Sequence, residues 1–350
     1  LNEVSSLVSE VFPRSTTEGV IFPHMEETHG QGPLYSLMSS PIQIGEDVMG
    51  VVIAANPQRY IGSKMERSYF DANDLFLLQA MAIQVGLGLT FIQIYDELSE
   101  KHRIEQEVQL AQEIQRSLLP EDPPQLQDNE IHGVCRAARQ VSGDFYDFIW
   151  ISPTLLLIVI ADASGKGIPA CMVAAMVRSM IRMIGPQHRD DLEVVMAEMN
   201  SKLYHDTEDW QFITMGCLLL DLSDSTVEYI RSGHTPLVIR YPNGDVHTIS
   251  PTGPALGLVP PELEPRFESF AFSLQPGMQL IMFTDGLNEA MNKENEQFGL
   301  ERMLDVIREA DCSAVDTVNL LLQKVDEFSQ GTVQADDQTL VVLRHVPKQR

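Results

Sequence analysis

The sequence TLLLIVIADASGKGIPA, at residues 154–170, is a continuous apolar run that meets an aspartate and then two glycines and a proline. Continuous apolar runs with β-branched residues are typical of strands that are buried on both faces. Pro169 suits the first turn of a helix, and a stretch rich in alanine and methionine follows it. The segment therefore predicts a buried strand that ends at Asp162 and opens directly into a helix.

Aspartates mark the ends of three further apolar runs. Asp144, in RQVSGDFYD, precedes FIWI; Asp285 follows QLIMFT; Asp336 and Asp337 precede TLVVLR. An unpaired carboxylate beside an apolar core is costly, so several of them near one another need cations to neutralise them. Taken alone, an Asp-Gly after a strand is often only a turn, and Asp336-Asp337 alone is compatible with a solvated loop. The four segments together predict a metal site.

An all-carboxylate site of this kind suits hard divalent cations. Mg²⁺ and Mn²⁺ prefer oxygen ligands and keep water at their remaining positions. Two such ions a few ångströms apart can activate a bridging water and polarise a phosphoryl group for in-line attack. The pattern therefore predicts metal-assisted hydrolysis of a phosphoester.

Strands and helices are expected throughout the rest of the chain after residue 130. The expected strands are CRAARQ, DFIWI, TLLLIVIA, FITMGCLLLD, STVEYIR, PLVIRY, VHTIS, ESFAFS, MQLIMFT and TLVVLR, and the expected helices span 168–184, 190–206, 298–310 and 313–329. Asn243-Gly244 predicts a hairpin turn between two of the strands. Methionines at 172, 176, 180 and 183 follow helical spacing and are expected to fill gaps in the core.

The N-terminal part has the pattern of a small α+β domain. Residues 40–55, SPIQIGEDVMGVVIAA, predict a β-hairpin around Gly-Glu-Asp. Asp71 or Asn73 is a candidate N-cap for the helix that follows, which carries apolar residues at helical spacing.

Residues 95–119 predict a linker helix with a narrow apolar stripe. Most positions of this stripe are three or four residues apart, without an intervening glycine or proline: Leu98, Ile104, Val108, Ala111, Ile114 or Gln115, and Leu118. Such a stripe packs on one partner, as in a short coiled coil, and a parallel homodimer is the leading interpretation. A helix that lies on its own domain is the alternative. Prolines at 120, 123 and 124 end the helix and mark a domain boundary.

The charge of the chain limits its partners and its location. The formal net charge of the 350 residues is −26 and the pI is near 4.6, which disfavours nucleic acid and anionic membranes as partners. We expect no secretory signal and no membrane span. Four widely separated cysteines without a C-x-x-C pair indicate reduced thiols in a cytoplasmic protein. Because the chain starts at Leu1, we expect the native N-terminus upstream.

The motifs SGDFYD, ADASGKGIPA, RSGHTPLVIR, FTDGLNEA and ADDQTLVVLR occur in this order. With these motifs the chain resembles the PPM-type metal-dependent protein Ser/Thr phosphatases, within them the bacterial SpoIIE/RsbU branch. The resemblance implies an α+β fold, namely a four-layer αββα sandwich at 121–350. Ahead of it we expect a partial GAF-like sensor domain at 1–93 and the linker helix at 94–120.

The resemblance also implies roles for individual residues. Asp162 corresponds to the aspartate that bridges two metals, with the Ala163 carbonyl on the second metal; Asp285 and Asp336 complete the first metal's ligands. Asp144 binds directly or through water, and Asp337 supports the ligands or a third, weaker metal. Arg139 matches the position that holds the substrate phosphate in many members, with a surface arginine as the alternative.

The general acid and the roles of two other residues stay open. The general acid of related enzymes has no matching histidine here. His234, in SGHTP, is expected to brace a loop rather than to act in catalysis. Lys166, between two glycines at a helix start, either orients the substrate or faces solvent.

The expected function is hydrolysis of phosphoserine or phosphothreonine on a bacterial signalling protein, with two Mn²⁺ or Mg²⁺ ions per site. The expected substrate is a phosphorylated STAS-type anti-sigma-factor antagonist, so the pathway is sigma factor regulation. The expected regulators are the homodimer and a possible small ligand of the GAF-like segment. Two alternatives are a non-catalytic sensor and dimerisation module, and a metal-dependent phosphoesterase of small molecules. A nucleotide substrate has thin support from Trp150 and Trp210.

Overall fold

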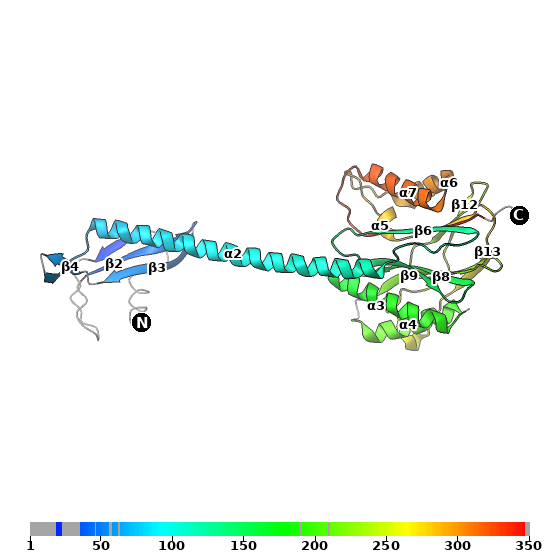
Figure 1. Ribbon diagram of the computed structural model, residues 1–350, viewed down its shortest axis with the longest axis horizontal. Coiled ribbons are helices and arrows are strands. Elements are labelled where there is room, and N and C mark those ends of the chain that lie inside the picture. The colour runs from blue at the N-terminus through cyan, green and yellow to red at the C-terminus, as the bar shows by residue number, and fades with distance from the viewer. Residues whose placement is uncertain are drawn as a thin grey trace. The chain divides into compact units, whose positions relative to one another are not determined.

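The computed structural model describes residues 19–22, 36–45, 47–55, 58–61, 64–189, 191–208 and 211–346. Its contacts divide the chain into two compact units, Leu1–Glu105 and Gln106–Arg350, called here the N-terminal and C-terminal units. Helix α2, Ala72–Leu118, runs from one unit into the other (Figure 1). The two expected helices on either side of residue 94 are thus one continuous helix. The boundaries 1–93, 94–120 and 121–350 stay predictions.

The N-terminal unit has a small antiparallel sheet and the first part of α2. The sheet has the order β1-β2-β3, and a separate hairpin joins β4 to β5. The bounds are β1 Val20–Phe22, β2 Leu37–Ile44, β3 Asp47–Ala55, β4 Gln58–Ile61 and β5 Lys64–Arg67. The β2–β3 pair confirms the hairpin expected at 40–55. The GAF-like interpretation of residues 1–93 stays a prediction.

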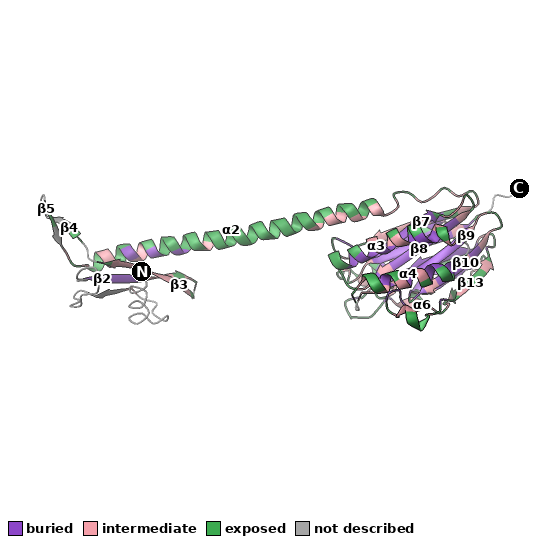
Figure 2. Cartoon of the chain, turned by 90° about the horizontal axis from the view of Figure 1, so that it is seen from below, coloured by how far each residue is buried: buried purple, intermediate pink, exposed green. Residues whose placement is uncertain are grey.

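Helix α2 begins where the sequence indicates. The Asp71 carboxylate accepts hydrogen bonds from the backbone N–H groups of Asn73 and Asp74, so Asp71 is the N-cap. A Cβ added at Gly86 would lie 2.8 Å from the Gln43 carbonyl oxygen, so this glycine lets the helix approach β2 closely. Leu78, Ala82 and Gly86 are the buried residues of the helix, and most of its remaining length is exposed (Figure 2).

The expectation that no apolar segment is long enough to span a membrane is wrong for this helix. Residues 75–95 are 21 consecutive positions without a charged side chain. By length and composition alone, two described helices qualify as candidate spans, α2 and Ile168–Gln187. The second packs its apolar face into the core of the C-terminal unit, which explains its composition. For α2, by contrast, 17% of the apolar window is buried.

The C-terminal unit contains two five-stranded antiparallel sheets. The first has the order β13-β10-β9-β8-β7 and the second β12-β11-β14-β15-β6. The strands of the first are β7 Asp144–Trp150, β8 Leu155–Ala163, β9 Ile213–Asp221, β10 Thr226–Ser232 and β13 Ser269–Ser273. Those of the second are β6 Asn129–Arg136, β11 Leu237–Arg240, β12 Val246–Ile249, β14 Gln279–Phe283 and β15 Gln338–His345.

Helices cover the outer face of each sheet (Figure 1). They are α3 Ile168–Ile184, α4 Leu192–Asp206, α5 Asp285–Asn288, α6 Gly299–Glu309 and α7 Ala314–Ser329. One apolar cluster lies between the first sheet and α3 and α4, a second lies between the sheets, and a third lies between the second sheet and α6 and α7. Three apolar layers separate four layers of secondary structure, so the unit is the expected αββα sandwich.

Most of the expected elements lie where the sequence placed them, with two corrections. The strand expected at CRAARQ lies earlier, at Asn129–Arg136, because the loop that follows is held by Asp337, as described below. The methionine stripe of α3 is only partly in the core: Met176 and Met180 pack against it, whereas Met172 and Met183 are 68% and 65% exposed.

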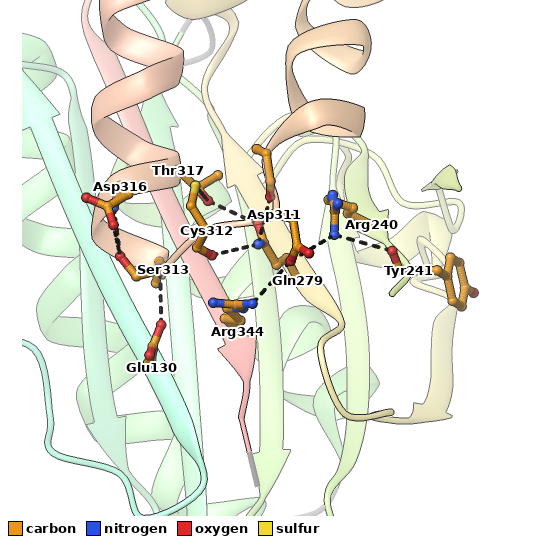
Figure 3. Close-up of polar contacts among 12 residues, drawn as sticks. Glu130, Arg240, Tyr241, Gln279, Asp311, Cys312, Ser313, Asp316, Thr317 and Arg344 are labelled. Atoms are coloured by element: carbon orange, nitrogen blue, oxygen red, sulfur yellow. Dashed lines mark hydrogen bonds and ion pairs between the residues drawn. The ribbon is translucent and has the colours of Figure 1, made fainter. Parts of the chain in front are cut away.

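A buried glutamine anchors the α6–α7 connection to the second sheet (Figure 3). The Gln279 side-chain amide donates to the carbonyl oxygens of Ala310 and Cys312, at 3.0 Å each, and accepts from the Thr317 hydroxyl at 3.1 Å. Asp311, beside them, pairs with Arg344 at 3.2 Å. These contacts fix the helices over the sheet at the start of β14, the end of that strand opposite to Asp285.

Candidate active site

Asp144 and Asp162 lie side by side on neighbouring strands. They are directly opposite each other in the antiparallel pair β7·β8, and Thr214 is opposite Asp162 on β9. Directly paired residues have their side chains on one face, with Cβ atoms about 5 Å apart. The register of the first sheet therefore brings two carboxylates and a hydroxyl into one row.

The second sheet supplies Asp285 and Asp336. Asp285 is the first residue of α5, separated from the end of β14 by one residue, and Asp336 precedes β15, the strand paired with β14. A Cβ added at Gly286 would lie 1.9 Å from the Asp337 carbonyl oxygen, so glycine is required for α5 to lie against this loop. The two sheets thus contribute two aspartates each to the group Asp144, Asp162, Asp285 and Asp336, called here the acidic cluster.

Two buried threonines join the sheets at Asp144. The hydroxyls of Thr284 and Thr339 both donate to Asp144 Oδ2 at 2.7 Å. Both threonines are fully buried, and Asp144 is 1% exposed. The sequence analysis missed them, although each lies within three residues of a motif aspartate, in FTDG and DDQT. They fix one oxygen of Asp144.

The acidic cluster is electrostatically costly. Burial and the neighbouring Asp162 raise the pKa of Asp144 well above its usual value. Burial, Asp285 and Asp336 raise the pKa of Asp162 to about 7. Burial, Glu289 and Asp336 raise the pKa of Asp285. Asp144, Asp162 and Asp285 thus resist ionisation because they are buried and lie near other carboxylates, and a bound cation would relieve this cost.

The donor set fits a hard divalent cation, since it consists of carboxylate oxygens and the nearby Ala163 backbone. That carbonyl faces Gly143, whose added Cβ would lie 3.0 Å from the oxygen. Among the residues that the structure describes, however, no three Asp, Glu, His or Cys side chains are arranged as a ready metal-binding group. The residues expected as ligands are together, but their side chains do not converge on one point.

Asp337 holds the loop between β6 and β7. Its Oδ1 accepts from the Ala138 N–H and its Oδ2 from the Gly143 N–H, both at 2.7 Å. Both oxygens thus accept hydrogen bonds from the backbone on either side of Arg139, and the role expected for Asp337 beside the metal ligands stays a prediction. Arg139 is exposed and has no hydrogen bond or ion pair within the described part of the chain.

Lys166 does not simply face solvent. Its ammonium donates to Asp336 Oδ2 and to the Ala335 carbonyl oxygen, both at 2.8 Å. The flanking Gly165 and Gly167 have φ values of +93° and +76°, which other residues rarely adopt. The lysine thereby links the loop after β8 to the loop before β15.

His234 is a buried neighbour of Thr214, the third member of the row formed by Asp144, Asp162 and Thr214. It is 3% exposed, and its Nδ1 is 2.8 Å from the Thr214 hydroxyl. Burial, together with Arg231, lowers the pKa of His234 to about 3. A neutral imidazole in this position fits the bracing role and does not supply the missing general acid.

The end of α2 contacts the loop that carries Asp144. The Gln115 side-chain amide donates to the Ser142 carbonyl oxygen at 2.6 Å and accepts from the Ser142 N–H at 2.9 Å. The Ser142 hydroxyl accepts in turn from the Asp144 N–H at 3.0 Å. Here the linker helix lies on its own unit, whereas Leu98, Ile104 and Ile114 are at least 49% exposed.

A second feature ties β7 to α3. The Asp147 carboxylate is fully buried and accepts two hydrogen bonds from the Arg182 guanidinium, at 2.6 and 2.7 Å. Arg178 is 2.9 Å from the same carboxylate. The sequence analysis did not assign Asp147; its ion pairs hold the helix that follows the Asp162 loop.

Comparisons with known proteins agree with this architecture. The family model described as Stage II sporulation protein E (SpoIIE) matches residues 152–346. Protein IcfG of Synechocystis sp. is 29% identical over 263 residues, 68% of this chain and 41% of IcfG, so the chain spans less than half of that relative. Phosphoserine phosphatase RsbU of Bacillus subtilis is 26% identical over 276 residues, 77% of this chain and 78% of RsbU.

Solved structures share the fold. The SiaA-PP2C domain of Pseudomonas aeruginosa superposes with a TM-score of 0.62 at 19% identity, over 70% of this chain and 98% of that one. The PP2C phosphatase domain of SpoIIE from Bacillus subtilis, with a fragment of its regulatory domain, gives 0.56 at 22% identity, over 63% and 64%. The C-terminal unit therefore has a PP2C phosphatase fold.

Proposed function

Since the chain belongs to the SpoIIE family, we propose that it is a metal-dependent protein serine/threonine phosphatase. The observation that carries the proposal is the acidic cluster, in which burial and neighbouring carboxylates raise the pKa of three of the four aspartates, Asp144, Asp162 and Asp285. Without bound cations, such a group of carboxylates would only destabilise the core. The relatives RsbU and RsbP of Bacillus subtilis are named phosphoserine phosphatases, which supports the activity.

In this proposal Asp144, Asp162, Asp285, Asp336 and the Ala163 carbonyl hold two Mn²⁺ or Mg²⁺ ions. When bound, such ions supply a nucleophilic water at neutral pH and stabilise charge on the phosphoryl oxygens. The chain's own residues prepare the site. Thr284 and Thr339 orient Asp144, and Asp337 positions the Arg139 loop.

Arg139 is the proposed phosphate-binding residue. A guanidinium donates two parallel hydrogen bonds to a phosphate, and this one has no partner among the described residues. Its loop is held at both ends by the two oxygens of Asp337, next to the strand that begins with Asp144. The positive charge of Arg139 would attract the phosphate locally, although the chain as a whole has a net charge of −26.

A phosphoprotein is the proposed substrate, of the STAS-type anti-sigma-factor antagonist class, in a bacterial signalling pathway. A nucleotide would need an aromatic or basic base-binding pocket near the cluster. Trp150 is at the opposite end of β7 from Asp144, six residues or about 20 Å away, so it does not provide one. Trp210 lies outside the described residues.

We place control of the enzyme in α2 and the N-terminal unit. The exposed apolar residues Leu98, Ile104 and Ile114 suit a parallel homodimer through the linker helix. The hydrogen bonds of Gln115 to Ser142 couple the position of the helix to the loop that carries Asp144. The GAF-like unit is the proposed sensor of a small ligand. The cysteines described here are all free thiols, which supports a cytoplasmic location.

The activity is tested by Mn²⁺-dependent release of phosphate from a phosphorylated STAS-type protein. Asp162→Asn is expected to lower the rate at least about a thousandfold, because it removes a proposed ligand of both ions. Asp305→Asn, on the exposed face of α6, is the matched control and should keep the rate. Release without metal, or an active Asp162→Asn variant, contradicts the proposal. Faster turnover of p-nitrophenyl phosphate than of the phosphoprotein favours the small-molecule phosphoesterase instead.

The dimer is tested by sedimentation of the full chain. Leu98→Glu combined with Ile104→Glu is expected to give monomers. Gln106→Glu, a substitution at an exposed polar position, should leave the mass of the sedimenting dimer unchanged. If the parent chain is already a monomer, the dimer is wrong. Pelleting of the parent chain with lipid vesicles would instead assign the apolar residues 75–95 to a membrane.

A further inference from the structure

Lys166 forms an ion pair with a residue of the acidic cluster. No other ion pair between described residues reaches Asp144, Asp162, Asp285 or Asp336. The ammonium lies 2.8 Å from Asp336 Oδ2, and the two side chains are 44% and 45% exposed. It also donates to the Ala335 carbonyl oxygen at 2.8 Å. The lysine is therefore a cation held by the chain itself at one edge of a group of like charges.

Both carboxylate oxygens of Asp336 already have a partner. Its Oδ1 accepts from the Asp337 N–H at 3.0 Å, and its Oδ2 carries the ammonium. This engagement agrees with the absence, among the described residues, of three carboxylates that converge as a metal-binding group. A divalent ion that binds Asp336 through Oδ2 would lie beside the ammonium, so the two cations would repel each other and compete for that oxygen.

The loop is built to permit that movement. Lys166 is flanked by Gly165 and Gly167, both with positive φ, and a Cβ at Gly167 would meet nothing within 4 Å. The lysine side chain is a flexible four-carbon stem that ends in a strongly hydrated charge, so its ion pair with a half-exposed carboxylate is weak. A divalent ion offers that carboxylate twice the charge at a shorter distance.

We propose that Lys166 is a tethered cation that competes with the divalent metal ion for Asp336. This inference rests on the proposed phosphatase function. The lysine neutralises part of the acidic cluster in the metal-free protein and sets the affinity of the ion that Asp336 binds. Metal uptake is then an exchange of one cation for another, and it releases the Lys166 ammonium to solvent.

The test is a Mn²⁺ titration of the full chain by calorimetry, repeated by electron paramagnetic resonance. Lys166→Met keeps the length of the side chain without its charge, and we expect about tenfold tighter binding, about 1.4 kcal/mol. Lys166→Arg keeps the charge and should bind no tighter than the parent. Lys324→Met is the matched control, because Lys324 pairs with Glu327 at the same 2.8 Å and is 43% exposed on α7. It should leave the affinity unchanged.

A second readout does not depend on affinity. Pulse labelling of amines with acetic anhydride, followed by mass spectrometry, should modify Lys166 faster when Mn²⁺ is added, with Lys324 as the internal reference. Equal Mn²⁺ affinity in the parent and Lys166→Met, weaker binding in Lys166→Met, or a labelling rate that ignores Mn²⁺ overturns the inference.

The two proposals fail in different ways. If Mn²⁺ binding is lost in Asp162→Asn but is the same with and without Lys166, the exchange is wrong and the phosphatase proposal stands. If the parent chain binds no Mn²⁺, or binds it equally well in Asp162→Asn, the metal site itself is wrong and both proposals fall.

Discussion

Removing one charge from the acidic cluster should stabilise the metal-free protein while it abolishes activity. The perturbation is Asp162→Asn. Burial, Asp285 and Asp336 raise the pKa of Asp162 to about 7 from its usual 3.8. The difference of about 3 units corresponds to an upper limit of about 4 kcal/mol at pH 8, at 1.36 kcal/mol per unit. Because the side chain keeps some solvent contact, we expect about half of that, ~2 kcal/mol.

The size of the effect depends on pH. A carboxyl group whose pKa is higher in the folded state binds protons more tightly there, so the free energy of unfolding falls as pH rises from about 4 to about 7. The amide that replaces this carboxyl group in the variant does not titrate. The advantage of the variant over the parent is therefore smallest near pH 4 and largest at pH 8.

The assay is urea unfolding in EDTA, followed by tryptophan fluorescence between pH 4 and pH 8. Both tryptophans of the chain, Trp150 and Trp210, belong to the C-terminal unit, so the signal reports on the part that holds the cluster. Saturating Mn²⁺ should make the parent more stable than the variant. At a Mn²⁺ concentration one hundred times the Kd of the parent, binding stabilises the parent by about 2.7 kcal/mol, and it stabilises the variant much less. Equal stability at pH 8, or a difference that is constant with pH, would falsify the electrostatic reasoning.

Three further substitutions test individual contacts. Arg139→Ala should raise KM for a phosphoprotein about tenfold with a smaller change in kcat, since it removes a phosphate contact; an unchanged KM in steady-state assays refutes the role. Thr339→Val should cost about 1–2 kcal/mol in urea unfolding and weaken Mn²⁺ binding, because Asp144 Oδ2 loses a buried donor, and Thr339→Ser should restore both. Gly286→Ala should abolish Mn²⁺ binding in calorimetry, because its Cβ would meet the Asp337 carbonyl oxygen at 1.9 Å; normal binding would show that the loop can give way.

Much of the C-terminal unit could be predicted because its signals are local. The helices expected at 168–184 and 313–329 differ by at most one residue from α3 and α7, since apolar spacing and nearby caps are written in adjacent residues. The Asn243-Gly244 turn was predicted for the same reason, and Gly244 has a φ of +87°. The strand expected at CRAARQ was misplaced, because Asp337, about 200 positions away, draws that segment into a loop.

For helix α2, the sequence pattern was interpreted incompletely. The spacing of apolar residues predicted the helix, but it was overlooked that residues 75–95 contain no charged side chain. The pattern also left open whether the linker packs on a second chain or on its own unit. The structure answers for the last turn only, where Gln115 contacts Ser142, and leaves Leu98 and Ile104 exposed.

The order of amino acids alone identifies the residues that carry charge at the ends of apolar strands, and hence shows that the candidate site is acidic. It could not determine what each carboxylate contacts. Asp144 meets Thr284 and Thr339 across 140 and 195 positions, and Lys166 meets Asp336 across 170. Hydrogen bonds require atoms to lie within about 3 Å, a precision that only the packing of the two sheets sets. Only the packed fold therefore shows that two threonines anchor Asp144, that Asp337 holds a loop, and that Asp336 forms an ion pair with a lysine.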